Sequence, residues 1–191
     1  KYGIATMTDV PYAFLRLVVE INGTIYEGYS ADNLPPKWFT KIPEAPLGGE
    51  MAEMLRFIEY ARETAVGLQA DTPFDLWLDL YEAQSAWGHS ENLAPLLSGF
   101  GTSMVERALI EAACRAANKP FAAAVRDQDL GIAMAAIQIQ LTTTKPHEWL
   151  PGQPLQSIIA RHTVGLADPL TPADIPADEA VADQLPQALT D

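Results

Sequence analysis

The sequence predicts an α+β fold in which an N-terminal antiparallel β-hairpin or meander precedes a bundle of helices. Two segments rich in β-forming residues, 14–21 and 24–31, are separated only by Asn22-Gly23. Three later segments repeat apolar residues at every third or fourth position, the period of a helix that buries one face. Strands grouped before helices are typical of the α+β class.

The hairpin is the strongest local feature of the first fifty residues. Asn22 and Gly23 tolerate the positive φ angles of a two-residue turn whose twist matches that of the flanking strands. We therefore expect residues 15–21 to form a strand that pairs directly across this turn with the strand that follows.

The segment from Asn33 to Gly49 is predicted to be a long ordered loop. Prolines interrupt regular structure by fixing φ and removing a backbone donor, and the segment contains Pro35, Pro36, Pro43 and Pro46. The bulky pair Trp38-Phe39 indicates that the loop packs on the protein. Loops of this length inside a compact domain are usually functional or disordered.

Helices are expected near residues 50–65, 73–86 and 103–117. The second follows Asp71-Thr72-Pro73, where a capping side chain precedes a proline at the first helical position. Its carboxylates Asp75, Asp79 and Glu82 are interpreted as a solvated face rather than a metal site, because they follow one polar edge of the helix.

The third helix is expected to begin after two glycines and to end before a proline. Gly99 and Gly101 precede the possible caps Thr102 and Ser103, and Asn118 is suited to a left-handed helix end. Cys114 lies among alanines of this helix, which favours a small packed residue over a catalytic thiol.

A further strand is predicted over Ser157–Leu166, and residues 165–191 resemble a solvated acidic connector with four prolines. His162 lies in this strand. A lone histidine in a strand is more often structural than catalytic, so His162 is kept as a barrel-strand candidate without an assigned role.

Composition excludes some partners. A formal charge of −13 repels a phosphate backbone, so nucleic acid is not expected, and no apolar run approaches the roughly 20 residues that span a membrane. The single cysteine fits a cytoplasmic protein. The motifs of nucleotide-binding loops, of serine hydrolases and of zinc proteases are missing, and His89, His147 and His162 are too widely spaced to define a site.

Two segments carry a resemblance to a known family. Residues 103–113, Ser-Met-Val-Glu-Arg-Ala-Leu-Ile-Glu-Ala-Ala, run on to Asn118-Lys119-Pro120-Phe121, and residues 92–97 precede them as Asn-Leu-Ala-Pro-Leu-Leu. Together with the order of hairpin, long loop and helices, they resemble the N-terminal capping domain of the enolase superfamily, in its mandelate racemase and muconate-lactonising branch. The glycine-rich turn usual after this helix is replaced by residues 124–127, Ala-Val-Arg-Asp.

The resemblance implies a capping domain over residues 1–152 and the truncated start of a TIM-type (β/α) barrel over 153–191, with Ile158–Val164 as the first barrel strand. In the family, the metal ligands and catalytic bases lie on later barrel strands, so no catalytic or metal-binding residue is transferred to this chain. Mg²⁺ is expected for the full-length protein, with a small carboxylate as substrate and homo-oligomers as a possibility. The shared reaction is abstraction of a proton α to a carboxylate.

The loop that follows the hairpin corresponds to the family's substrate lid. Its candidate residues are Asp32, Lys37, Trp38 and Phe39, because bulky aromatics beside a cation could meet a carboxylate substrate. Trp38 and Phe39 could instead only anchor the loop to the core. The main alternative outside the family is a non-enzymatic α+β module for binding or interaction.

Overall fold

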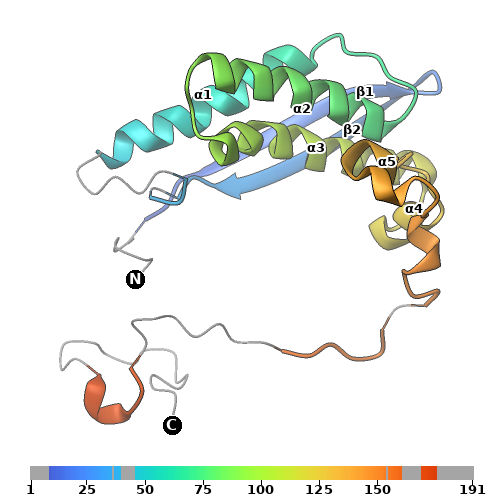
Figure 1. Cartoon of the computed structure of the whole chain (residues 1–191). Helices are drawn as coiled ribbons and strands as arrows, with labels where there is room; N and C mark the ends of the chain where they lie inside the picture. Colours follow the sequence, from blue (N-terminus) through green and yellow to red (C-terminus); the bar gives the residue numbers. More distant parts are fainter. Residues whose placement is uncertain (1–8, 36, 40–45, 154, 161–168, 176–191) are drawn as a thin grey trace. The chain divides into compact units, whose positions relative to one another are not determined.

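A computed structural model describes residues 9–35, 37–39, 46–153, 155–160 and 169–175. The chain forms two compact units, Lys1–Gly152 and Gln153–Asp191, which are described separately. The first unit is an α+β structure, an antiparallel two-stranded hairpin followed by a bundle of three main helices (Figure 1).

The predicted hairpin is confirmed. Strands β1 (Tyr12–Ile21) and β2 (Thr24–Asn33) pair antiparallel, with Ile21 opposite Thr24. Asn22 and Gly23 have φ angles of 52° and 77°, so both turn residues lie in the left-handed region that asparagine and glycine adopt most readily.

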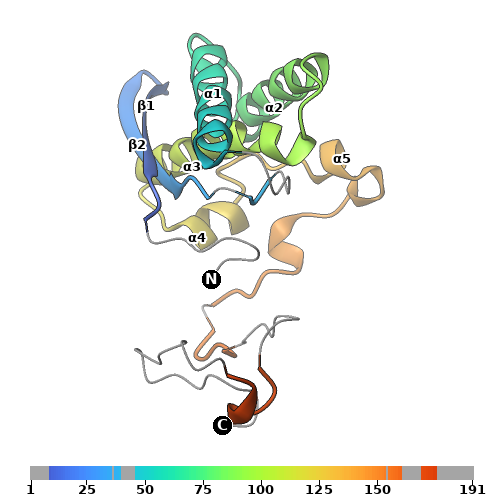
Figure 2. The ribbon, with the colours of Figure 1, turned by 90° about the vertical axis from the view of Figure 1, so that its left-hand side faces the viewer.

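The main helices are α1 (Leu47–Ala65), α2 (Pro73–Ser90) and α3 (Pro95–Ala117). Shorter elements follow: α4 (Phe121–Arg126), α5 (Met134–Ile137) and 3₁₀ turns at Ile139–Leu141, Pro146–Glu148 and Pro172–Asp174. Helix α3 contacts both strands and both other main helices, and Figure 2 shows the hairpin at one side of the bundle.

Helix α3 begins eight residues before the predicted start. The prediction that Thr102 or Ser103 caps this helix is therefore wrong. Pro95 occupies the first turn instead, and the glycines lie inside the helix. Gly101 is there because of close packing: a Cβ on it would lie 2.2 Å from the carbonyl oxygen of Phe57 in α1. At the other end Asn118 has φ 52° and ψ 44°, which confirms the predicted left-handed terminus.

Helix α2 starts as the sequence predicts. The Thr72 hydroxyl accepts a hydrogen bond from the Asp75 backbone N–H at 3.1 Å, and Pro73 occupies the first turn. Inside the bundle, Gln84 of α2 donates from Nε2 to the Phe57 carbonyl oxygen at 3.1 Å, and Ser98 of α3 donates to the Gln84 carbonyl oxygen at 2.9 Å.

The core lies where α3 meets its neighbours. Phe57, Leu80, Met104 and Ala108 are fully buried in it. Gly28 of β2 lies so close to α3 that a Cβ would approach the Ala108 carbonyl oxygen to 1.8 Å. The missing side chain at Gly28 therefore lets the hairpin dock directly on α3.

The second unit departs from the predicted strand in its described part. Residues 157–160 have no strand structure, and Ile158 and Ile159 are 87% and 96% exposed. A parallel barrel strand depends on neighbouring strands for its backbone hydrogen bonds, and none is paired with these residues. The remainder of the predicted strand, with His162, lies outside the described residues.

Candidate functional site

The loop after β2 is fastened to α1 through one buried ion pair. Lys37 has a left-handed φ of 63°, and its backbone N–H donates to Glu50 Oε2 at 2.7 Å. Its Nζ lies 3.8 Å from Glu50 Oε1, and the two side chains are only 7% and 8% exposed. Because Glu50 lies in the first turn of α1, the helix dipole also favours its negative charge.

The adjacent aromatic residues separate into one packed and one exposed side chain. Phe39 packs against the main core, with its ring centroid 5.2 Å from that of Phe100 in α3. Trp38 is 54% exposed. Phe39 and the Lys37–Glu50 pair thus hold the loop, while Trp38 remains accessible. Positions 36 and 40–45 of the predicted loop lie outside the described residues.

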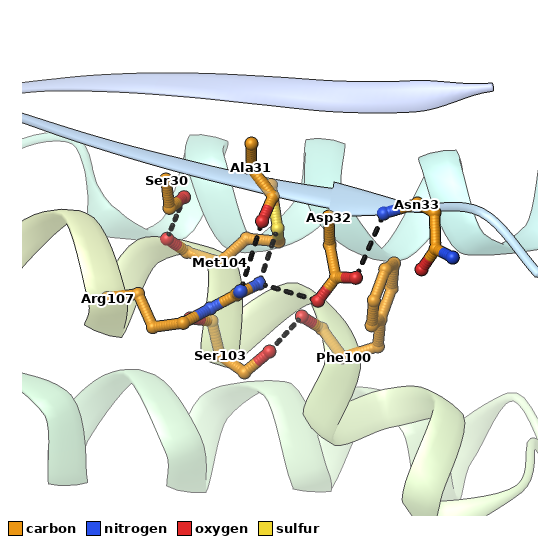
Figure 3. A network of polar contacts seen from close by, with 8 residues as sticks. All are labelled: Ser30, Ala31, Asp32, Asn33, Phe100, Ser103, Met104 and Arg107. Atoms are coloured by element: carbon orange, nitrogen blue, oxygen red, sulfur yellow. Dashed lines mark hydrogen bonds and ion pairs between the residues drawn. The ribbon is translucent and has the colours of Figure 1, made fainter. Parts of the chain in front are cut away.

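Asp32 takes part in a polar network between β2 and α3 (Figure 3). Arg107 of α3 donates to Asp32 Oδ2 at 3.0 Å and to the Ala31 carbonyl oxygen at 3.1 Å. Nearby, Ser30 donates its hydroxyl to the Met104 carbonyl oxygen at 2.6 Å. Asp32 therefore fixes the end of the hairpin to α3, and Arg107 already neutralises its charge.

One turn further along α3, Glu111 also holds β2. It accepts hydrogen bonds from the Tyr29 backbone N–H and from Arg115 Nη2, the latter at 2.6 Å. The Arg115 hydrogen bond, followed by the Tyr29 backbone bond, lowers the pKa of Glu111. Glu106, on the same helix, behaves in the opposite way, because burial raises its pKa.

A groove of about 980 Å³ lies on the other side of the hairpin, beside β1. Every residue from Leu15 to Asn22 lines it, and the opposite wall comes from the end of α1 and the connection to α2, residues 65–73. Its floor is apolar where α3 contributes Val105, Leu109 and Ala113.

The remaining sequence candidates do not gather into a site. His89 is exposed in the last turn of α2, and His147 is exposed in a 3₁₀ turn. Burial is the main cause that raises the pKa of Cys114, which disfavours the reactive thiolate. Among the residues that the structure describes, no group of three or more His, Cys, Asp or Glu side chains could hold a metal ion.

Sequence reasoning missed the contacts that Glu50, Arg107 and Glu111 make with β2 and the loop after it. Their partners Lys37, Asp32 and Tyr29 are 13, 75 and 82 positions away, so no local pattern connects them. The four-residue spacing of Glu111 and Arg115 predicted an ion pair along α3, which the structure has. The same spacing could not predict that side chains of this helix contact β2.

Comparisons of the chain with protein-family models, with curated proteins and with solved structures gave no match. A search of the described helices found none both long and apolar enough to cross a bilayer.

Proposed function

We propose that this chain is the capping part of an enolase-superfamily enzyme, with residues 153–191 as the beginning of its barrel. The whole enzyme would act on a small carboxylate by removing the proton α to it, as a racemase, dehydratase or cycloisomerase. The enzyme would be cytoplasmic and would assemble as a homo-oligomer. The capping part would shield the barrel's active site from water and select the substrate.

The observation that carries the proposal is the arrangement of the loop after β2. The buried Lys37–Glu50 pair and the Phe39–Phe100 contact hold the loop at its base, while Trp38 is half exposed beside them. A lid needs such a combination, because a fixed base allows one accessible apolar side chain to cover a substrate. The hairpin and the three helices in this order support the same proposal.

The roles of the four lid candidates follow from their contacts. Trp38 is proposed to cover the substrate. Lys37 and Phe39 hold the loop, and Asp32 fixes the hairpin through Arg107. A substrate carboxylate would therefore be bound by cations of the barrel rather than by Lys37, whose charge Glu50 already neutralises.

Mg²⁺ would stabilise the enediolate that develops when the proton leaves. The residues described here do not form a set of ligands that fits the ion, so we assign no step of the reaction to them. Barrel strands beyond this chain would provide the ligands and the base.

The decisive experiment uses the complete polypeptide encoded by the gene. In D₂O with Mg²⁺, exchange of the α-proton of carboxylates is followed by proton NMR over a panel of hydroxy acids, sugar acids and amino acids. We expect exchange with at least one of them, and expect Trp38→Ala to change kcat/KM while the fold is kept. A complete polypeptide without barrel strands bearing spaced acidic residues and a lysine pair would contradict the proposal.

A second candidate function is a non-enzymatic binding module. The groove beside β1 favours it, because this concavity lies away from the Lys37–Glu50 loop and is lined by different residues. The two functions are distinguishable, since proton exchange depends on the barrel, and binding in the groove does not.

A further inference from the structure

Three asparagines of the described chain share one backbone conformation. Asn22, Asn92 and Asn118 have φ angles of 52°, 55° and 52°, and the side chains of all three are exposed. Asn22 lies in the hairpin turn, whereas the other two lie just after α2 and α3. The residue that follows is glycine only after Asn22. The three positions are therefore matched in conformation and exposure, and they differ in the backbone nitrogen that comes next.

The state of this next nitrogen decides whether it can attack the asparagine side chain. The Leu93 N–H donates to the Gly88 carbonyl oxygen at 2.9 Å, and the Lys119 N–H donates to the Cys114 carbonyl oxygen at 3.0 Å. For the Gly23 N–H, no such bond is recorded within the described residues. A Cβ on Gly23 would meet no atom within 4 Å apart from its chain neighbours. The Gly23 nitrogen is therefore the one that neither a helix carbonyl nor a side chain restrains.

We propose that Asn22 is a site of spontaneous covalent modification, at which the chain converts to aspartate or isoaspartate. The Gly23 nitrogen loses its proton and attacks Asn22 Cγ, the bond from Cγ to Nδ2 breaks, and ammonia leaves. The product is a five-membered succinimide ring. Water then breaks one of the two carbonyl–nitrogen bonds of the ring: cleavage at Cγ gives aspartate, and cleavage at the backbone carbonyl gives isoaspartate. One water is consumed and one ammonia is released, with no oxidation or reduction. The proposal is independent of the enolase-type activity.

The folded turn controls the rate of this reaction. A two-residue hairpin turn with positive φ at both positions is of type I′, in which the first residue has a ψ of about +30°. This ψ directs the Gly23 nitrogen away from the Asn22 Cβ, whereas the ring requires both on the same side of the Cα–C bond. The turn must therefore open before the ring closes, and the rate depends on how often the end of the hairpin opens.

The two products affect the hairpin differently. Aspartate before glycine also suits this turn, so the pairing of Ile21 with Thr24 is kept. Isoaspartate adds one methylene to the main chain, so two residues no longer close the same register. Ile21 packs against the buried cluster that contains Ala113 and Leu130. Isoaspartate at position 22 therefore loosens the contact between the end of the hairpin and this cluster.

The experiment compares the 191-residue chain with a synthetic peptide of residues 17–28, both incubated at neutral pH below the melting temperature of the protein. Mass spectrometry of proteolytic fragments measures conversion at each asparagine, and enzymatic methylation identifies isoaspartate. Asn22 should convert at least about fivefold more slowly than in the peptide, while Asn92 and Asn118 stay unchanged. An unconverted Asn22 when the peptide has converted fully, or faster conversion at Asn92 or Asn118, would overturn the proposal.

Two variants separate the sequence motif from the structure. Lys119→Gly gives Asn118 a following glycine whose N–H still donates to the Cys114 carbonyl oxygen. Asn118 of this variant should convert at least about fivefold more slowly than Asn22 of the same chain, and equal rates would overturn the selection by the free nitrogen. Asn22→Gly keeps a pair of residues suited to the turn and should abolish the isoaspartate signal. A signal that persists would assign it to another residue and overturn the proposal.

The dependence on opening is tested at the two ends of the hairpin. Ile21→Ala removes the contact with the buried cluster and should bring the rate at Asn22 closer to that of the peptide. Tyr12→Ala, at the far end, changes a side chain that is 60% exposed and should leave the rate unchanged. If Ile21→Ala does not fold, the comparison of the wild-type chain with the peptide decides. Equal rates at Asn22 in the folded wild-type chain and in the peptide would overturn control by the turn.

Discussion

Gly28 and Gly99 have the same side chain and very different surroundings. A Cβ on Gly28 would lie 1.8 Å from the Ala108 carbonyl oxygen, while a Cβ on Gly99, inside α3, would meet no atom within 4 Å apart from the neighbouring backbone of its own helix. The first glycine is needed for close approach of hairpin and helix. The second only adds backbone freedom to the unfolded chain.

Gly28→Ala should therefore destabilise the protein by about 2–3 kcal/mol, because the backbone of β2 must move away from α3. The matched change Gly99→Ala should stabilise it by about 0.5–1 kcal/mol through helix propensity. Urea unfolding followed by circular dichroism measures both. Equal effects of the two substitutions would show that β2 does not dock on α3 at Gly28.

At the scale of elements, the loop after β2 depends on Phe39 more than on Trp38. Phe39→Ala removes the contact with Phe100 and should cost about 2–3 kcal/mol of unfolding free energy, whereas Trp38→Ala should cost less than about 1 kcal/mol, because the indole is half exposed. Thermal or chemical unfolding of both variants tests this difference. A larger loss for Trp38→Ala would identify Trp38 as a core residue and remove it as a lid candidate.

The junction of α3 with β2 should weaken in acid. Since its folded pKa is lowered, ionised Glu111 contributes stability that is fully present above the unfolded glutamate pKa of about 4.3, and this contribution is lost as pH falls through the lowered folded value. The protection factor of the Tyr29 amide, which is the intrinsic hydrogen-exchange rate at each pH divided by the observed rate, should fall over that interval. In Glu111→Gln this pH dependence should disappear; persistence of the full effect would assign it to another group.

For the whole molecule, stability should reside in the first unit. Both groups of packed apolar side chains draw their members from residues before Gly152. A chain that ends at Gly152 should therefore melt within about 3 °C of the 191-residue chain, as differential scanning calorimetry can determine. A substantially lower melting temperature would mean that residues 153–191 contribute to the core of the first unit.

Local chemistry determined much of this fold from the sequence. Asn22-Gly23 specified the hairpin turn, Thr72-Pro73 specified the start of α2, and Asn118 specified the end of α3, since each depends on the φ preference or capping group of a few adjacent residues. The predicted start of α3 was wrong because it, too, was inferred from the preferences of a few adjacent residues. Glycine disfavours helix locally, but close packing of Gly101 on Phe57 outweighs that preference.

Only the tertiary structure decided which charged residues are free to act. The sequence placed Lys37 beside two aromatics, but α1 brings Glu50 to it and buries the pair, and α3 brings Arg107 to Asp32. The same helix also supplies the side chains that bond to backbone groups on the outer edge of β2. These partners come together through packing between distant segments, which no periodicity or motif within one segment can encode.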